Sequence, residues 1–295
     1  MRSFHLARRL ATRACAVLGL AMLAGAAMAQ ATLERIQHRG QINVGYRVGA
    51  APFSLQDSAG QPQGYSLEFC RAVIVELQSA LGSERPVRFM PVATDQRLRM
   101  LREGSIDLLC DSTTDTAERR NMVDFSTPIF LDAIQIMVRA KDGISASTQL
   151  AGKSVVVIGT TTAPQAVAQY AGQQKLSWQV AKAVNAEAAI GQLQLGWAQG
   201  YARDGVLLAS QKASASNGGD YVILPERLSS EPIALAFRKG DAQMRKMVDG
   251  VITRSMQNGS LQTWYDKWFV QATPPARPLG IPMSDELRTL IARTK

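Results

Sequence analysis

A short stretch in the first half of the chain carries residue types that bind anions. Residues 110–120 read Cys-Asp-Ser-Thr-Thr-Asp-Thr-Ala-Glu-Arg-Arg and follow an apolar run that ends at Leu108-Leu109. Asp115 or Thr116 is suited to cap a short helix that carries Arg119. Backbone N–H groups at a helix start favour negative charge, and an arginine one turn later can hold a carboxylate through two N–H bonds. The stretch predicts an anion pocket, and it also fits a capped surface helix with a solvated Glu-Arg-Arg face.

Strands that alternate with helices are expected to position this pocket. Apolar spacing predicts, in order, a strand over 41–46, a helix over 65–81, a strand over 87–91, a helix over 96–103 and a strand over 106–110. This alternation is typical of a parallel α/β layer, in which ligands lie beyond the carboxyl ends of the strands. Four polar residues come just after predicted strand ends: Arg47, Thr94, Arg97 and Ser112.

The first 29 residues have the form of an export signal. Arginines without any acid precede an apolar run from Ala14 to Ala27, and Ala27-Met28-Ala29 forms a small-residue cleavage site. Four of the 33 Lys and Arg leave with this segment, so 29 remain against 24 Asp and Glu, a net charge of +5. No later apolar run has the length of a membrane span. We expect an exported protein that is not inserted in the membrane.

The sequence contains no complete motif for catalysis, cofactor binding or nucleic-acid binding. Gly152-Lys153-Ser154 looks like the end of a phosphate-binding loop, but Ser147 stands where that loop needs its first glycine. Lys/Arg runs and aromatic-basic interleaving are absent, which argues against nucleic acid as a partner. His38, the one histidine left after the leader, lies in a polar stretch. The sequence predicts no cofactor, no metal site and no catalytic residue.

Two cysteines remain after the leader, Cys70 in a predicted helix and Cys110 at a predicted strand end. In an oxidising compartment such a pair can close into a disulfide, because a helix packed over a sheet brings these positions together. Two separately buried thiols fit the pattern equally well. The sequence leaves both possibilities open.

Motifs spread over nearly the whole chain after the leader resemble the solute-binding proteins of bacterial amino-acid ABC transporters, family 3. In order they are Gly64-Tyr65-Ser66-Leu67-Glu68, Ser112-Thr113-Thr114 with Glu118-Arg119-Arg120, Asp124-Phe125-Ser126-Thr127-Pro128, Leu150-Ala151-Gly152-Lys153, Asp204-Gly205-Val206-Leu207-Leu208 and Trp264-Tyr265-Asp266-Lys267-Trp268-Phe269. Two further motifs resemble the glutamate/aspartate-binding branch: Val44-Gly45-Tyr46-Arg47 and Pro274-Pro275. Each motif is weak alone, and their shared order and spacing carry the resemblance.

The resemblance implies an α/β fold of the two-lobed periplasmic binding protein class (type II, Venus flytrap) with two hinge crossings. The expected division is a signal peptide over 1–29, a discontinuous first lobe over 30–127 and 234–295, and a second lobe over 128–233 that includes hinge segments 128–132 and 229–233. The second lobe is expected to hold strands near 134–138, 154–158 and 221–224 and helices near 164–170 and 187–195. Helices over 241–256 and 261–269 and a tail helix over 284–293 are expected on the first lobe.

The resemblance also implies a division of roles among the site residues. Arg119 is expected to bind an amino-acid α-carboxylate, helped by Thr161 at the start of a second-lobe helix, while Ser112, Thr114 and Asp204 hold the α-ammonium. Asp204 also fits a helix N-cap. Three residues are expected at a side-chain carboxylate: Arg47, Thr94 and Arg97. The branch usually offers a second-lobe histidine there, and residues 184–187 contain none; Asn185 is a candidate neutral donor, whereas an inward Glu187 would repel an acidic ligand.

The function implied is that of a periplasmic, monomeric binding component that delivers glutamate, aspartate or a related acidic amino acid to the membrane permease of an ABC importer. Glutamine or another polar amino acid is an alternative ligand. A different class, an enzyme on the same scaffold such as a cyclohexadienyl-type dehydratase, needs a general acid in the cleft. Glu187 and Asp115 are the candidates, and neither has an evident partner, so we expect no enzyme activity.

Overall fold

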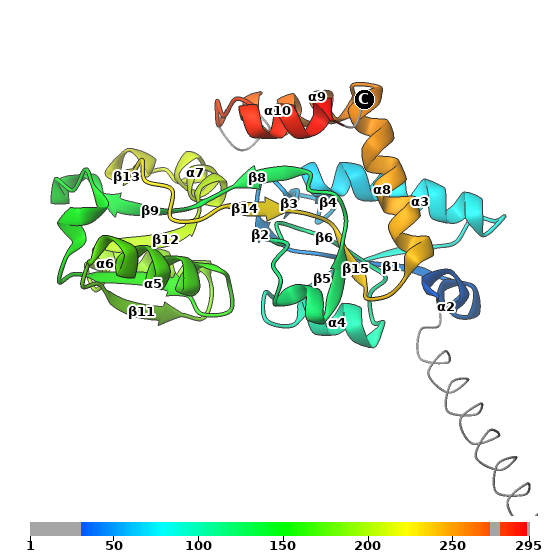
Figure 1. Cartoon of the computed structure of the whole chain (residues 1–295), viewed down its shortest axis with the longest axis horizontal. Coiled ribbons are helices and arrows are strands. Elements are labelled where there is room, and N and C mark those ends of the chain that lie inside the picture. The colour runs from blue at the N-terminus through cyan, green and yellow to red at the C-terminus, as the bar shows by residue number, and fades with distance from the viewer. Residues whose placement is uncertain (1–30, 272–277, 294–295) are drawn as a thin grey trace, which may run out of the picture.

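The computed structural model describes residues 31–271 and 278–293 (Figure 1). The predicted signal peptide and the Pro274-Pro275 motif lie outside these residues. The described chain forms two α/β lobes joined by two extended segments, which confirms the predicted fold class. Within the described ranges, no helix is long and apolar enough to cross a membrane.

The first lobe is built on a five-stranded sheet in the order β5-β1-β6-β15-β7. Strands β5, β1 and β6 are parallel, and β15 pairs antiparallel with β6 and β7. Before the first crossing its elements are α2 (Thr32–Arg39), β1 (Ile42–Tyr46), β2 (Gly49–Ala50), β3 (Ser54–Gln56), β4 (Pro62–Gln63), α3 (Tyr65–Ala80), β5 (Val87–Pro91), α4 (Arg97–Glu103), β6 (Leu108–Cys110), the 3₁₀ turn η1 (Arg119–Asn121) and β7 (Val123–Phe125). After the second crossing they are β15 (Ala236–Arg238), α8 (Ala242–Gln257), α9 (Ser260–Tyr265), the π turn η5 (Asp266–Val270) and α10 (Asp285–Ala292).

Alternating side chains place the two faces of this sheet in separate cores. Val44 and Tyr46 of β1 are buried with residues of α3 and α8 on one face. On the other face Leu109 of β6 packs in a cluster with Leu101 of α4. Successive residues of a strand point to opposite faces, so a buried strand must be apolar throughout. This explains why the strands read as short continuous apolar runs.

The second lobe holds another five-stranded sheet, in the order β11-β10-β12-β9-β13. Strands β11, β10 and β12 are parallel, and β9 runs antiparallel to β12 and β13. Helix α5 covers one face and helices α6 and α7 the other. The elements are β9 (Ile134–Arg139), η2 (Ala140–Asp142), η3 (Ser147–Leu150), β10 (Ser154–Ile158), α5 (Ala163–Gln174), β11 (Gln179–Ala183), α6 (Ala186–Leu195), β12 (Gly200–Asp204), α7 (Gly205–Ser214), η4 (Gly218–Asp220) and β13 (Tyr221–Ile223).

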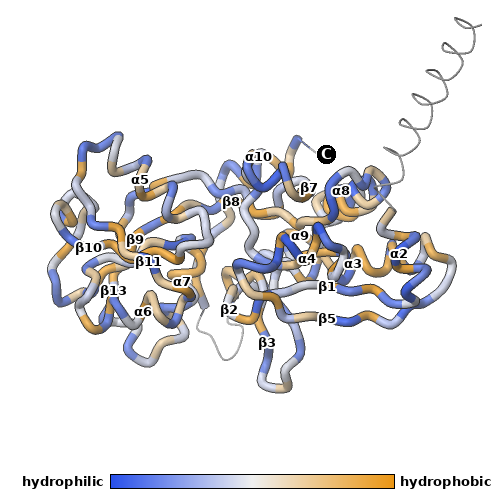
Figure 2. Tube along the Cα trace, turned by 90° about the horizontal axis from the view of Figure 1, so that it is seen from below, coloured by the Kyte–Doolittle hydropathy of each residue, from blue (hydrophilic) through white to orange (hydrophobic). Residues whose placement is uncertain are grey.

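The two connecting segments pair with each other as a two-stranded antiparallel ribbon of β8 (Phe130–Asp132) and β14 (Glu231–Ile233). Figures 1 and 2 show β8 between the two lobes in both views. Phe130 is anchored in the first lobe, where its ring stacks on Phe269 with centroids 4.7 Å apart and meets Phe53 edge-on at 5.1 Å. The ribbon is therefore fixed to one lobe at this end. The residue limits proposed for the lobes stay a prediction.

The C-terminal segment lies against the hinge as well as the first lobe. Leu287 of α10 belongs to the first-lobe core, and the Tyr265 hydroxyl donates to the Pro282 carbonyl at 3.1 Å. A cavity of about 310 Å³ separates this segment from the second lobe at Val206 and Ala209. The tail therefore covers the first lobe, as expected, and reaches past it to the start of α7.

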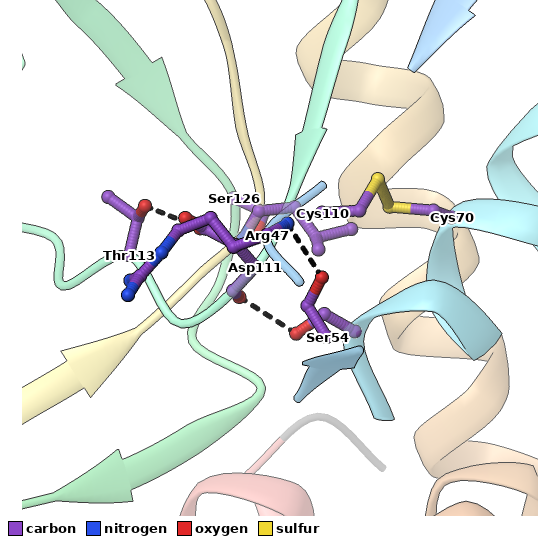
Figure 3. The surroundings of a disulfide bond; sticks show 9 residues. Arg47, Ser54, Cys70, Cys110, Asp111, Thr113 and Ser126 are labelled. Carbon is purple, nitrogen blue, oxygen red and sulfur yellow. Dashed lines mark hydrogen bonds between the residues drawn. A yellow bond between two sulfur atoms is a disulfide. The ribbon is translucent and has the colours of Figure 1, made fainter. Parts of the chain in front are cut away.

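A disulfide joins Cys70 of α3 to Cys110 at the end of β6 (Figure 3). Beside it the Ser66 hydroxyl donates to the Asp111 carbonyl at 2.9 Å. Two links thus tie α3 to the point where β6 ends and the predicted anion-binding stretch begins. The structure resolves the choice that the sequence left open in favour of the cross-link.

We predict that removing this cross-link lowers stability without changing the fold. The bonded cysteines are 40 residues apart, and closing such a loop in the unfolded chain corresponds to about 4 kcal/mol by the chain-entropy model. The double variant Cys70→Ala/Cys110→Ala should lose about 2 to 4 kcal/mol of unfolding free energy in urea titrations. Reducing agent should destabilise the parent protein to a similar extent and leave the variant unchanged; equal stability of parent and variant would contradict the prediction.

Candidate functional site

The predicted site residues lie at the carboxyl ends of the parallel strands in the two sheets. Strands β1, β5 and β6 run parallel, so the residues that follow them emerge at one edge of the first lobe. Strands β10 and β12 likewise end at Ile158 and Asp204 at one edge of the second lobe. A hydrogen bond between lobes, from Arg203 Nη2 to the Gly49 carbonyl at 2.9 Å, shows that these edges meet. The region where the two edges face each other is called the crevice below.

Arg97 is held in place by a buried carboxylate. Its side chain is 3% exposed, and its Nε donates to the Thr113 hydroxyl at 2.9 Å and lies 3.4 Å from Asp111 Oδ2. Its Nη1 donates to the Thr94 carbonyl, and the Thr113 hydroxyl in turn donates to Asp111 Oδ1. Burial lowers the pKa of Arg97, and Asp111 is the strongest opposing influence. Asp111 therefore neutralises Arg97 from within the protein, a role that the sequence analysis did not assign.

Arg119 is oriented by the backbone of the anion-binding stretch. Its Nη1 donates to the Thr114 carbonyl at 2.9 Å, and its backbone N–H donates to the Thr116 hydroxyl at 3.2 Å. Thr116 is thus the residue that satisfies the start of η1, whereas Asp115 forms an ion pair with Arg120. Burial lowers the pKa of Arg119, and Asp111, Asp204 and Glu231 oppose that shift.

Arg47 has no carboxylate partner. Its backbone N–H donates to the Ser54 hydroxyl at 2.9 Å (Figure 3), but its guanidinium forms no ion pair with any described residue. Burial lowers the pKa of Arg47 to about 10, and the charges of Arg97 and Arg203 push it in the same direction, whereas those of Asp111 and Asp204 oppose the shift. A partly buried guanidinium beside other cations is a site that an anion stabilises.

Asp204 brings a carboxylate from the second lobe. It is 8% exposed and directly precedes α7, but the backbone N–H of Val206 donates to Asp132 Oδ2 at 3.2 Å. Asp132 therefore supplies the helix cap that the sequence allowed for Asp204. Burial raises the pKa of Asp204, Glu231 raises it further, and Arg203 and Arg47 oppose the shift. The carboxylate of Asp204 thus acts electrostatically on arginines of both lobes.

The polar residues expected at the site differ in their contacts. The Ser112 hydroxyl is buried and has no hydrogen-bond partner among the described residues. Thr161 precedes α5, and its hydroxyl donates to the Ile158 carbonyl at 2.8 Å; no described hydrogen bond links it to the first lobe. Asn185 is exposed and caps α6, because its Oδ1 accepts from the Ala188 backbone N–H at 2.9 Å. An unsatisfied buried hydroxyl is costly, so the Ser112 hydroxyl can gain from a further hydrogen-bond partner.

Charges of both signs lie in this crevice. Its arginines are Arg47, Arg97, Arg119 and Arg203. Asp111, Asp204 and Glu231 act on them, and Asp95 and Glu118 add the weakest influences on Arg97 and Arg119. Among the described residues, Arg97 is the one of these four arginines that forms an ion pair with a carboxylate. Asp111, Glu231 and Arg203 were not predicted as site residues; of these, Arg203 has a visible signal in the sequence, because it directly precedes Asp204.

Comparisons with known proteins identify relatives that bind small solutes. The family model described as bacterial extracellular solute-binding proteins, family 3, matches residues 42–271. The glutamate/aspartate import solute-binding protein of Escherichia coli K12 is 29% identical over 94% of this chain and 95% of its own length. The L-glutamate/L-aspartate-binding protein of Pseudomonas aeruginosa is 33% identical over 88% and 87%.

Solved structures share the fold. An ancestral arginine-binding protein bound to arginine has a TM-score of 0.67 and 28% identity, covering 78% of this chain and 99% of that one. An ancestral amino acid-binding protein described as a precursor of cyclohexadienyl dehydratase has a TM-score of 0.67 and 26% identity, with 80% and 99% covered. One scaffold thus carries different ligands, so the side chains in the crevice must decide which one is bound.

The hinge carboxyl of Asp132 generates a prediction for stability. Burial raises its pKa to about 8, Asp204 adds to the shift, and hydrogen bonds from Ala133 and Val206 oppose it. The folded protein therefore keeps a proton that the unfolded chain releases above about pH 4, so unfolding free energy should fall as pH rises from about 5 to about 8, by at most about 1.4 kcal/mol per pH unit. Asp132→Asn should flatten this fall in urea titrations, and identical slopes for both proteins would contradict it.

Proposed function

Because the chain belongs to the bacterial extracellular solute-binding proteins of family 3, we propose that it binds an acidic amino acid, glutamate or aspartate, in the periplasm. In this proposal it acts as an exported monomer and delivers the ligand to the membrane permease of an ABC importer. Relatives from two bacteria that match along most of their length bear glutamate/aspartate-binding names, which supports this ligand class. The predicted signal peptide supports the periplasmic location.

The observation that carries the ligand class is the uncompensated guanidinium of Arg47. Arg97 already forms an ion pair with Asp111. Arg47 forms no ion pair with any described carboxylate and lies within electrostatic reach of Arg97 and Arg203. A neutral ligand side chain would leave this positive charge desolvated and unpaired when the crevice closes. A side-chain carboxylate removes that cost. The unpaired guanidinium of Arg47 therefore favours glutamate or aspartate over glutamine.

The roles of the remaining residues follow from their placement. Arg119 binds the α-carboxylate, because the Thr114 carbonyl orients its guanidinium. The free hydroxyl of Ser112 and the carboxylate of Asp204 hold the α-ammonium. Thr161 adds the start of α5. The side-chain carboxylate is held by three residues of the first lobe: Arg47, Arg97 and Thr94.

Binding of one ligand by both lobes accounts for closure. Asp204 belongs to the second lobe and the three ligand arginines to the first, so an open form cannot make all contacts at once. A ligand that binds the closed form more tightly shifts the population toward it. No chemistry is required. Asp115, one of the two acids considered as a general acid, is committed to an ion pair with Arg120.

Calorimetry with matched amino acids tests the proposed ligand class. Glutamate and aspartate should bind the mature protein, whereas glutamine and asparagine, which have the same shape without the charge, should bind much more weakly. At 100 times its Kd the ligand should also stabilise the protein by about 2.7 kcal/mol in thermal unfolding. Heat only with neutral or basic amino acids would overturn the assignment.

Two arginine variants test the division of roles. Arg119→Met should weaken glutamate and glutamine alike by roughly 100-fold or more, because both carry an α-carboxylate. Arg47→Met should weaken glutamate to a similar extent and change glutamine by less than about threefold. Arg47 is the cleaner choice than Arg97, whose removal also leaves Asp111 buried without a partner. Equal losses for both ligands in both variants would contradict the assigned roles.

A further inference from the structure

Arg203 lies where the second lobe meets the first and has no role in the proposed site so far. It is the fourth of the five buried residues of β12, is 5% exposed and directly precedes Asp204. Its Nη2 donates to the Gly49 carbonyl of the first lobe at 2.9 Å, and its Nη1 lies 3.5 Å from Gln211 Oε1 of α7. The guanidinium therefore reaches out of its own lobe.

The charge of Arg203 is not neutralised by a bonded carboxylate. Among the described residues it forms no ion pair, and the structure gives partners to two of its five N–H donors. Nearby, the buried Tyr201 hydroxyl, two residues earlier on the same strand, lies close enough to Arg203 for a side-chain hydrogen bond from the guanidinium to oppose the rise of the Tyr201 pKa. A buried guanidinium with no bonded carboxylate and with spare donors can bind an anion.

Arg203 also acts on Arg47 across the crevice. The positive charge of Arg203 disfavours the charged form of Arg47, so two guanidinium groups from different lobes lie within electrostatic reach of each other. Like charges that approach in a desolvated crevice repel, and this repulsion opposes closure over an empty or neutral site. An anion placed between them converts the repulsion into two attractions.

We propose that Arg203 is the second-lobe half of the site for the ligand side-chain carboxylate, which is held between Arg47 of the first lobe and Arg203 of the second. The proposal rests on the proposed function and deepens it. It makes closure itself sensitive to the second negative charge, because only an acidic side chain relieves the opposition between the two arginines. Arg203 then distinguishes acidic from neutral ligands, because it contacts the ligand side chain only when the two lobes are closed.

A purely structural role for Arg203 predicts a different outcome. If its bond to the Gly49 carbonyl served only to tie the lobes together, removing the side chain would weaken every ligand by the same factor. If it bound the side-chain carboxylate, the loss would fall on acidic ligands alone. The ratio of glutamate to glutamine affinity separates the two roles.

The test is calorimetric titration of Arg203→Met with glutamate and glutamine. The variant should lose at least about 30-fold in glutamate affinity and less than about threefold in glutamine affinity. Lys141→Met is the matched control: it removes the same charge from the same lobe, at an exposed position near the end of the sheet remote from Asp204. It should bind both ligands as the parent does. Equal losses for both ligands, or no loss, in Arg203→Met would overturn the proposal.

Two further measurements keep the test decisive. Arg203→Lys retains the charge, so it should keep more of the glutamate preference than Arg203→Met; this variant decides the matter if the methionine protein does not fold.

Loss of glutamate affinity in the double variant Arg47→Met/Arg203→Met should be less than the product of the single losses, because both groups act on one carboxylate. Independent, multiplicative losses would count against the shared site. If the parent protein binds no acidic amino acid, the proposed function is wrong. If the parent binds glutamate and Arg203→Met binds it equally well, only the role proposed for Arg203 is wrong.

Discussion

The structure depends on holding several arginines near one another inside a crevice in which, among the described residues, only Arg97 is ion-paired with a carboxylate. Desolvation disfavours each of these guanidinium groups, as the lowered pKa of Arg47, Arg97 and Arg119 shows. Asp111 offsets part of this cost because it is fully buried beside Arg97. The remaining imbalance can be relieved by a bound anion, and the two-lobed architecture provides the enclosed space in which that relief is large.

Three acids lie close together where the hinge meets the second lobe. Asp132 and Glu231 pair in register on the hinge ribbon, and Asp204 follows at the edge of the second-lobe sheet. The charge of Asp204 raises the pKa of Asp132, and the charge of Glu231 raises the pKa of Asp204, each in the same direction as burial. A cationic ligand group placed beside Asp204 lessens this repulsion.

Much of the fold was predictable because burial leaves a periodic pattern. The predicted helix over 65–81 and the strand over 154–158 match α3 and β10 within one residue. Strands β11 and β12 of the second lobe were not predicted. Four of the five residues of β11 are exposed or only partly buried, so it lacks an apolar run, and β12 is buried throughout but ends in Arg203 and Asp204, which interrupt its apolar pattern. The predicted helix over 261–269 begins as α9 and ends in a π turn, which no simple spacing reveals.

The site was predictable where hydroxyls and arginines follow strand ends in a recognisable order. The sequence could not reveal that Asp132, far along the chain, caps α7 in place of Asp204, because that choice depends on how β8 passes the helix start. The partnership of Arg97 with Asp111 likewise depends on the side-chain geometry around Thr113. Such roles arise from tertiary contacts that residue spacing does not encode.

The cysteine bridge sets an order of events for the chain. Cys110 immediately precedes Asp111, so the cross-link to α3 clamps the backbone that presents the arginine-neutralising carboxylate. Such bridges form in oxidising compartments and not in the reducing cytosol. The redox state of the surrounding compartment therefore decides whether the backbone that presents Asp111 is clamped to α3.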